Sequence, residues 1–125
     1  MVDEKTTMAD LRREVEKFVQ ERKWRKFHNP KDLAISICLE AAELLELFQW
    51  LSQREVWRLA RNPAARSKIG EELADIQIYL LCLANVLNFD ISQLVAEKLQ
   101  RDRERYPAEN FKGRAPTSAD EKRCH

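Results

Sequence analysis

"ICLEAAELLELFQW", residues 37–50, is apolar almost throughout, yet it carries three glutamates, Glu40, Glu43 and Glu46. On a helix, with about 100° between successive residues, the glutamates fall on one side and apolar side chains cover the other sides. A helix that is apolar over most of its circumference is buried against neighbours on several sides. The stretch therefore predicts a central helix of an all-α protein of the four-helix-bundle type.

The acidic side of this helix has no basic residue near it, since no lysine or arginine lies between Lys31 and Arg54. One interpretation is a strip that faces water, as charged strips of helices usually do. Solvated strips normally mix signs, however, because like charges one turn apart cost about a few tenths of a kcal/mol. The single sign favours the other interpretation, in which the strip binds something cationic.

A second segment of the same character follows, "KIGEELADIQIYLLCLANVL", residues 68–87. After Lys68 its only charges are Glu71, Glu72 and Asp75. Glu72 and Asp75 have the same three-residue spacing as the first two glutamates of the earlier helix. If the two helices pack antiparallel, two carboxylates from each helix converge on one place.

Such a convergence predicts a metal site. Four carboxylates closer than ~5 Å cannot all stay ionised unless cations are present. Ligand sets made only of oxygen select hard cations, here Mg²⁺ and sometimes Mn²⁺. The candidate ligands are Glu40, Glu43, Glu72 and Asp75.

Length, charge and cysteine content narrow the class of protein. The chain has 125 residues, which suits one domain with a core, and a net charge of +1, which predicts neither nucleic acid nor an anionic membrane as a partner. It contains no apolar run of membrane-spanning length and no signal-peptide core. Cys38 and Cys82 lie in apolar helical patterns, as core residues would, and Cys124 lies in the tail, so a reduced, cytoplasmic protein is expected.

Helix-start and helix-stop signals divide the chain into helices without any alternating strand pattern. Thr7, Asn29, Ser52, Asn62 and either Asp90 or Ser92 are the expected N-caps. The expected helices cover residues 8–22, 30–51, 53–61, 63–88 and 91–106. Residues 1–107 are then one helical domain, and residues 108–125 are a polar tail, either mobile or packed on a partner subunit.

Two further segments suggest binding to a nucleotide. "AEKLQRDRERYP", residues 96–107, has basic side chains on one helix face that could bind phosphate, although a helix end that faces solvent has the same pattern. "KWRKFHNP", residues 23–30, offers Trp24 and His28. Trp24 could stack on a nucleobase, which is worth ~1–3 kcal/mol, or it could pack in the core, and His28 could bind a base or bond within a loop.

These motifs, taken in order, resemble those of the MazG-like all-α nucleoside triphosphate pyrophosphohydrolases. The family motif E-x-x-E followed by E-x-x-D reads Glu40-Ala-Ala-Glu43 and Glu72-Leu-Ala-Asp75 here. The stretches "FHNP", "LFQW" and "RYP" resemble the dCTP pyrophosphatase branch, over roughly residues 10–110. The resemblance implies Mg²⁺-dependent hydrolysis of a nucleoside triphosphate to the monophosphate and pyrophosphate, with the four motif carboxylates as metal ligands.

The resemblance also implies roles for residues outside the acidic motif. It assigns the base pocket to Trp24, His28 and Trp50 and the phosphate side to Lys98 and Arg105. Tyr79 matches a tyrosine of the family. Asp102 departs from the pattern, because the family usually has an asparagine there, and a carboxylate accepts hydrogen bonds but does not donate them unless protonated. This difference bears on which base is preferred more than on the reaction.

The favoured function is therefore a pyrophosphohydrolase for dCTP or a modified dCTP that cleans the nucleotide pool. Two alternatives stay open: the same fold acting on dUTP, another pyrimidine nucleotide or phosphoribosyl-ATP, and a non-catalytic regulator that binds nucleotide or a partner helix. The central helix has more apolar surface than one short chain covers, since Leu44, Leu45 and Phe48 need further neighbours. This agrees with the dimers or tetramers that the resemblance implies, so a homo-oligomer is expected.

Overall fold

The computed structural model describes residues 1–122, and every regular element in that part of the chain is a helix. The all-α prediction is thus confirmed, while Cys124 lies outside the described residues. The elements in chain order are α1 (Met8–Glu21), η1 (Arg25–Phe27), α2 (Pro30–Glu46), α3 (Gln53–Arg61), α4 (Pro63–Leu87), α5 (Ile91–Arg105), α6 (Ala108–Phe111) and α7 (Ser118–Lys122).

The chain divides into two compact units, Met1–Phe89 and a second unit that begins at Asp90. The first unit holds α1 to α4 and all the acidic motif residues, and the second holds α5 and the short helices α6 and α7. A domain boundary at residue 107, with a mobile tail behind it, stays a prediction.

The helices begin where the sequence signals predicted them, with side-chain caps on the free backbone N–H groups of their first turns. The Thr7 hydroxyl accepts a hydrogen bond from the backbone N–H of Asp10 at 3.1 Å, and the Asp10 carboxylate accepts one from Thr7 at 2.9 Å. The N-caps of α1 to α5 are Thr7, Asn29, Ser52, Asn62 and Asp90. Asp90, rather than Ser92, therefore begins α5.

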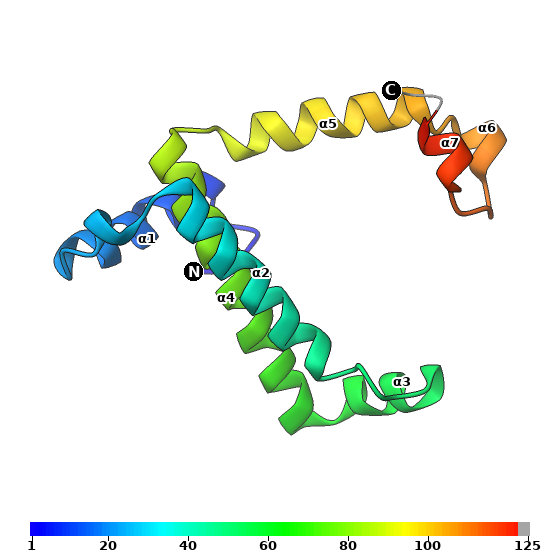
Figure 1. The fold of residues 1–125 in the computed structure, drawn as a ribbon, viewed down its shortest axis with the longest axis horizontal. Coiled ribbons are helices and arrows are strands. Elements are labelled where there is room, and N and C mark those ends of the chain that lie inside the picture. The colour runs from blue at the N-terminus through cyan, green and yellow to red at the C-terminus, as the bar shows by residue number, and fades with distance from the viewer. Residues whose placement is uncertain (123–125) are drawn as a thin grey trace. The chain divides into compact units, whose positions relative to one another are not determined.

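Helix α4 is the centre of the first unit, because it packs against α1, α2 and α3. Figure 1 shows α2 and α4 side by side with opposite chain directions, the antiparallel arrangement expected from the sequence. The buried cluster of Val19, Leu33 and Cys82 joins α1, α2 and α4 at one end of this pair. Burying apolar side chains from three helices fixes their mutual position and hence that of their polar faces.

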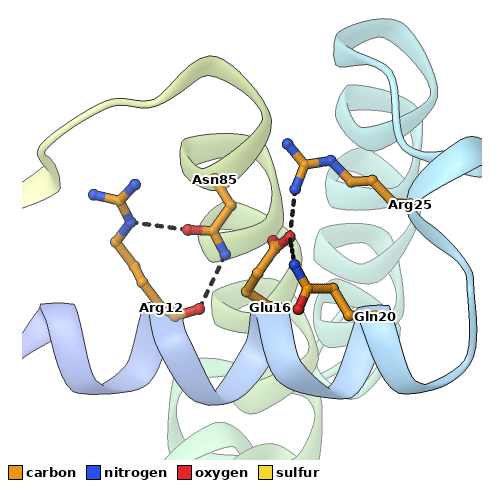
Figure 2. Close-up of polar contacts among 5 residues, drawn as sticks. All are labelled: Arg12, Glu16, Gln20, Arg25 and Asn85. Carbon is orange, nitrogen blue, oxygen red and sulfur yellow. Dashed lines mark hydrogen bonds and ion pairs between the residues drawn. The ribbon is translucent and has the colours of Figure 1, made fainter.

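Polar side chains also attach α1 to α4. The Arg12 side chain donates through Nε to Asn85 Oδ1 at 2.9 Å, and Asn85 Nδ2 donates back to the Arg12 backbone carbonyl at 3.0 Å (Figure 2). The two bonds satisfy both ends of the half-buried amide, which would otherwise cost free energy.

Two expectations were wrong. Helix α2 ends at Glu46 and not near Leu51, because Leu47 and Phe48 donate to carbonyls three residues back, at 3.3 and 2.9 Å, and the chain turns toward the cap of α3. The apolar pattern of the sequence continues through this turn, so it gave no sign that the helix ends there. Cys38 is exposed, whereas Cys82 is buried as expected. Cys38 is therefore not a core residue in the described part of the chain.

No single helix within residues 1–122 is long and apolar enough to cross a membrane, and α4 and α5 meet that test only when they are joined as a bent pair.

Candidate metal and nucleotide site

Three carboxylates converge where α2 and α4 face each other. Glu40 and Glu43 lie one turn apart on α2, and Glu72 comes from α4. Each offers one carboxylate oxygen, and the three oxygens all lie within 4.8 Å of one another. The antiparallel packing of two helices therefore brings three of the four motif carboxylates into one acidic cluster.

The cluster is graded in exposure from a buried to an open side. Glu72 is 4% exposed, Glu40 is half-buried and Glu43 is exposed. Glu40 Oε2 and Glu72 Oε2 are buried and make no hydrogen bond in the structure. An ionised oxygen without a partner is costly to bury, because it loses hydration and gains nothing in return. A cation that reached these two atoms would offset that cost.

Like charge dominates the electrostatics of the cluster. Glu40 raises the pKa of Glu43 above its usual value of 4.5 through a shared hydrogen bond and through its charge, and Glu72 acts in the same direction. This repulsion can be relieved by a proton shared between two carboxylates, and it can equally be relieved by a divalent cation. The donor set is oxygen only and fits a hard cation such as Mg²⁺ or Mn²⁺.

Asp75, the fourth carboxylate of the motif, is not in this cluster. It follows Glu72 by one turn on α4 and is exposed, and among the described residues only Glu40, Glu43 and Glu72 form a group of metal-ligand type. Glu46 continues the acidic side of α2 but is also outside the group. Its exposure agrees with a strip that faces water, while the interpretation that the strip binds a cation stays a prediction.

A basic residue that the sequence interpretation did not use completes the cluster. Lys68 Nζ lies 3.0 Å from Glu72 Oε1 and 3.6 Å from Glu71 Oε2. Hydrogen bonding to Glu72, followed by the charge of that carboxylate, raises the pKa of Lys68. The four-residue spacing between Lys68 and Glu72 on one helix was the signal that could have shown this pair.

The aromatic candidates of the first unit lie in different surroundings. Trp24 is 45% exposed and meets the Phe18 ring edge-on, with 5.7 Å between the ring centroids, so it is not a core residue. Trp50 is 86% exposed in the turn after α2. Tyr79 instead packs against the buried core cluster. His28 is half-buried at the end of η1.

An ion pair holds the segment that carries Trp24 and His28. Arg25 donates to Glu16 Oε1 at 2.5 Å, and Gln20 donates to the same oxygen at 3.1 Å (Figure 2). Glu16 and Gln20 belong to α1, so the segment between α1 and α2 is attached to the first unit by a charged contact. Arg25 and Glu16 are nine positions apart across a loop, so the sequence gave no signal for their ion pair.

The remaining candidates belong to the second unit. Lys98 and Asp102 form an ion pair along α5. Arg105 is half-buried, and its guanidinium carbon lies 5.3 Å from the centroid of the Tyr106 ring. Tyr106 in turn meets Phe111 of α6 edge-on at 5.1 Å, which links α6 to the end of α5.

The chain resembles known proteins over most of its length. A family model described as the MazG-like family matches residues 35–120. The chain is 40% identical over 109 residues to dCTP pyrophosphatase 1 of Mus musculus, an alignment that covers 87% of this chain and 64% of that protein. For dCTP pyrophosphatase 1 of Homo sapiens the identity is 39% over 102 residues, covering 82% and 60%. The chain thus spans less than two thirds of the length of these relatives.

A solved structure is similar as well. A pyrophosphatase from Archaeoglobus fulgidus superposes with a TM-score of 0.75 at 38% identity, and the match covers 80% of this chain and 92% of that one. At this identity the likeness extends to sequence and is not limited to the arrangement of helices.

Proposed function

The chain belongs to the MazG-like family, and on that premise we propose that it is a divalent-cation-dependent nucleoside triphosphate pyrophosphohydrolase. The reaction is attack of water on the α-phosphorus, which releases pyrophosphate and leaves a nucleoside monophosphate. The observation that carries the proposal is the pair of buried carboxylate oxygens without partners, Glu40 Oε2 and Glu72 Oε2, beside Glu43. Such a group suits a binding site for a cation better than it suits a structural contact.

In this proposal Glu40, Glu43 and Glu72 hold Mg²⁺ or Mn²⁺, and Asp75 joins them from the exposed side of α4. A bound Mg²⁺ would supply positive charge to phosphate oxygens and would lower the pKa of an attacking water. The chain's own task is to keep three carboxylates in place. The packing of α2 on α4 does this, since both helices contribute to one buried core.

The proposed substrate is dCTP or a modified dCTP. The names of the mouse and human relatives support this choice. Exposed Trp24 and Trp50 offer faces for stacking on a base, and His28 offers one directed hydrogen bond. On the phosphate side we propose Lys98 and Arg105.

Tyr79 and Asp102 each have a second contact that bears on their place in this scheme. Tyr79 is proposed as a wall of the base pocket although its ring also packs on the core. Asp102 is proposed to accept a hydrogen bond from a cytosine amino group. Its present partner is Lys98, so it would have to share or leave that ion pair.

We propose further that the chain works as a homo-oligomer, a dimer or a tetramer. Helices α2 and α4 leave large apolar side chains uncovered, and Leu39, Leu45 and Leu73 are each more than half exposed. Apolar patches on this scale usually mark an interface. A second copy of the chain is the partner that the resemblance implies.

The test is a panel of nucleoside triphosphates with Mg²⁺, Mn²⁺ and a chelator, with pyrophosphate release as the readout. The proposal expects release from dCTP that depends on the divalent cation and falls off for purine nucleotides. Faster turnover of dUTP would keep the reaction and change the substrate. Binding without turnover of any nucleotide would instead support a regulator.

A further inference from the structure

Lys68 is a cationic partner of the acidic cluster. Its Nζ lies 3.0 Å from Glu72 Oε1, while a second carboxylate, that of Glu71, lies 3.6 Å away. The Lys68 side chain is 55% exposed, and that of Glu72 is 5% exposed. Lys68 thus extends from solvent to a carboxylate that is almost fully buried.

The pair is not explained by the usual preference of helical surface pairs. On an isolated helix a glutamate four residues before a lysine is the better order, and here the lysine comes first. Glu72 also faces the other helix, where one carboxylate oxygen of Glu40 and one of Glu43 lie within 4.8 Å of one of its own. Lys68 therefore pairs with a carboxylate at which two further carboxylates converge.

The second partner of Lys68 gives it a place to move. Glu71 is exposed, with a side-chain accessibility of 66%, so an ion pair with it buries nothing and costs little. A lysine side chain has four flexible methylene groups and a compact charge, which lets it swing between two carboxylates. The Glu72 side chain cannot move in the same way, because it is buried where α4 packs on α2.

We propose that Lys68 is a built-in competitor of the divalent cation at Glu72, and that cation binding transfers Lys68 to Glu71. The inference rests on the proposed function, because it requires the acidic cluster to bind a divalent cation. A singly charged ammonium and a doubly charged ion repel each other when both contact one carboxylate. Lys68 then stabilises the cluster when no cation is bound, and it lowers the affinity of the cluster for the divalent cation.

The experiment is calorimetric titration of Mg²⁺ and of Mn²⁺ into three proteins, together with their thermal midpoints in chelator. The proteins are the wild type, Lys68→Met and the matched control Lys17→Met, which removes an exposed lysine of another helix, α1. Lys68→Met should bind the cation more tightly, on the order of tenfold, as expected for a unit charge and a divalent charge a few ångströms apart in water. Its midpoint in chelator should be lower than that of the wild type.

Two further variants keep the outcome interpretable. Lys68→Arg keeps the charge and should keep the wild-type affinity, and Lys68→Gln replaces Lys68→Met if the latter loses its helical circular dichroism. An affinity in the neutral variants equal to or weaker than that of the wild type overturns the role of Lys68 as a competitor. Absence of cation binding by the wild type and by every variant overturns the metal site of the proposed function, and this inference with it.

Discussion

Replacing Glu40 and Glu43 together by glutamine should abolish the stabilisation of the protein by Mg²⁺. The change removes two of the three clustered charges and keeps the size of the side chains. Helix α2 should be unaffected, because glutamate and glutamine have nearly the same helix propensity. Without Mg²⁺ the double variant should be at least as stable as the wild type, since repulsion with Glu72 is relieved.

The size of the effect follows from mass action and from the size of the unit that melts. A ligand present at 100 times its dissociation constant stabilises the native state by ~2.7 kcal/mol. The cluster lies in the unit Met1–Phe89. For a domain of that size ~1 kcal/mol shifts the midpoint by about 4–8 °C, so saturating Mg²⁺ should raise the wild-type midpoint by roughly 10–20 °C.

The assay is thermal unfolding followed by circular dichroism, with Mg²⁺ varied at constant ionic strength. Glu46→Gln is the matched control, because Glu46 lies on the same acidic side of α2 but outside the cluster. The control should keep the full Mg²⁺ response and the double variant should lose it. An equal response in all three proteins would refute the metal assignment, since the ion would then be acting elsewhere.

Three other changes probe the same account. In chelator, the raised pKa of Glu43 stabilises the folded protein fully below the usual value of 4.5, and this stabilisation is lost as pH rises through the raised pKa. Glu43→Gln should therefore make the free energy of unfolding depend less on pH. Trp24→Ala should raise the KM of several nucleotides by a similar factor, equivalent to the ~1–3 kcal/mol of binding free energy that stacking contributes. Asp102→Asn should change the relative kcat/KM for dCTP and dUTP by the equivalent of ~1–2 kcal/mol. The same change removes the ion pair with Lys98, which should alter the free energy of unfolding by about a few tenths of a kcal/mol.

Each of these has a result that would count against it. A pH profile of stability that is the same in Glu43→Gln and the wild type would show that the pKa of Glu43 is not linked to folding. For Trp24, the control is Trp57→Ala, an exposed tryptophan on α3; equal effects of the two changes on KM would place the base elsewhere. Unchanged relative kcat/KM for dCTP and dUTP in Asp102→Asn would leave the ion pair as that residue's role.

The sequence was sufficient for the helices and for most of the acidic cluster, because both depend on local patterns. N-caps such as Thr7 and Asn29 are set by side chains within three residues of the backbone groups that they bind. The convergence of Glu40, Glu43 and Glu72 required one additional assumption, that two helices with acidic sides pack antiparallel. Hydrophobic periodicity supports that assumption, since both helices need partners on several sides.

What the sequence did not reveal depends on contacts across loops and on the geometry of single turns. The end of α2 at Glu46 is set by hydrogen bonds that tighten the last turn, and the apolar pattern continues through them. Asp75 has the spacing of a ligand but lies outside the group of Glu40, Glu43 and Glu72, so its part in the site stays a prediction. The Arg25–Glu16 pair was missed because the two residues are nine positions apart across a loop, whereas the four-residue spacing of Lys68 and Glu72 was a visible signal that the interpretation did not use.

The central claim is that the clustered carboxylates support cleavage between the α and β phosphorus of a nucleoside triphosphate. Phosphorus NMR of dCTP incubated with the protein and Mg²⁺ tests it most directly, with Glu72→Gln as the inactive comparison. The account predicts equal amounts of dCMP and pyrophosphate from the wild type, no turnover in chelator and none from Glu72→Gln. Formation of dCDP and inorganic phosphate, or turnover by Glu72→Gln at the wild-type rate, would contradict it.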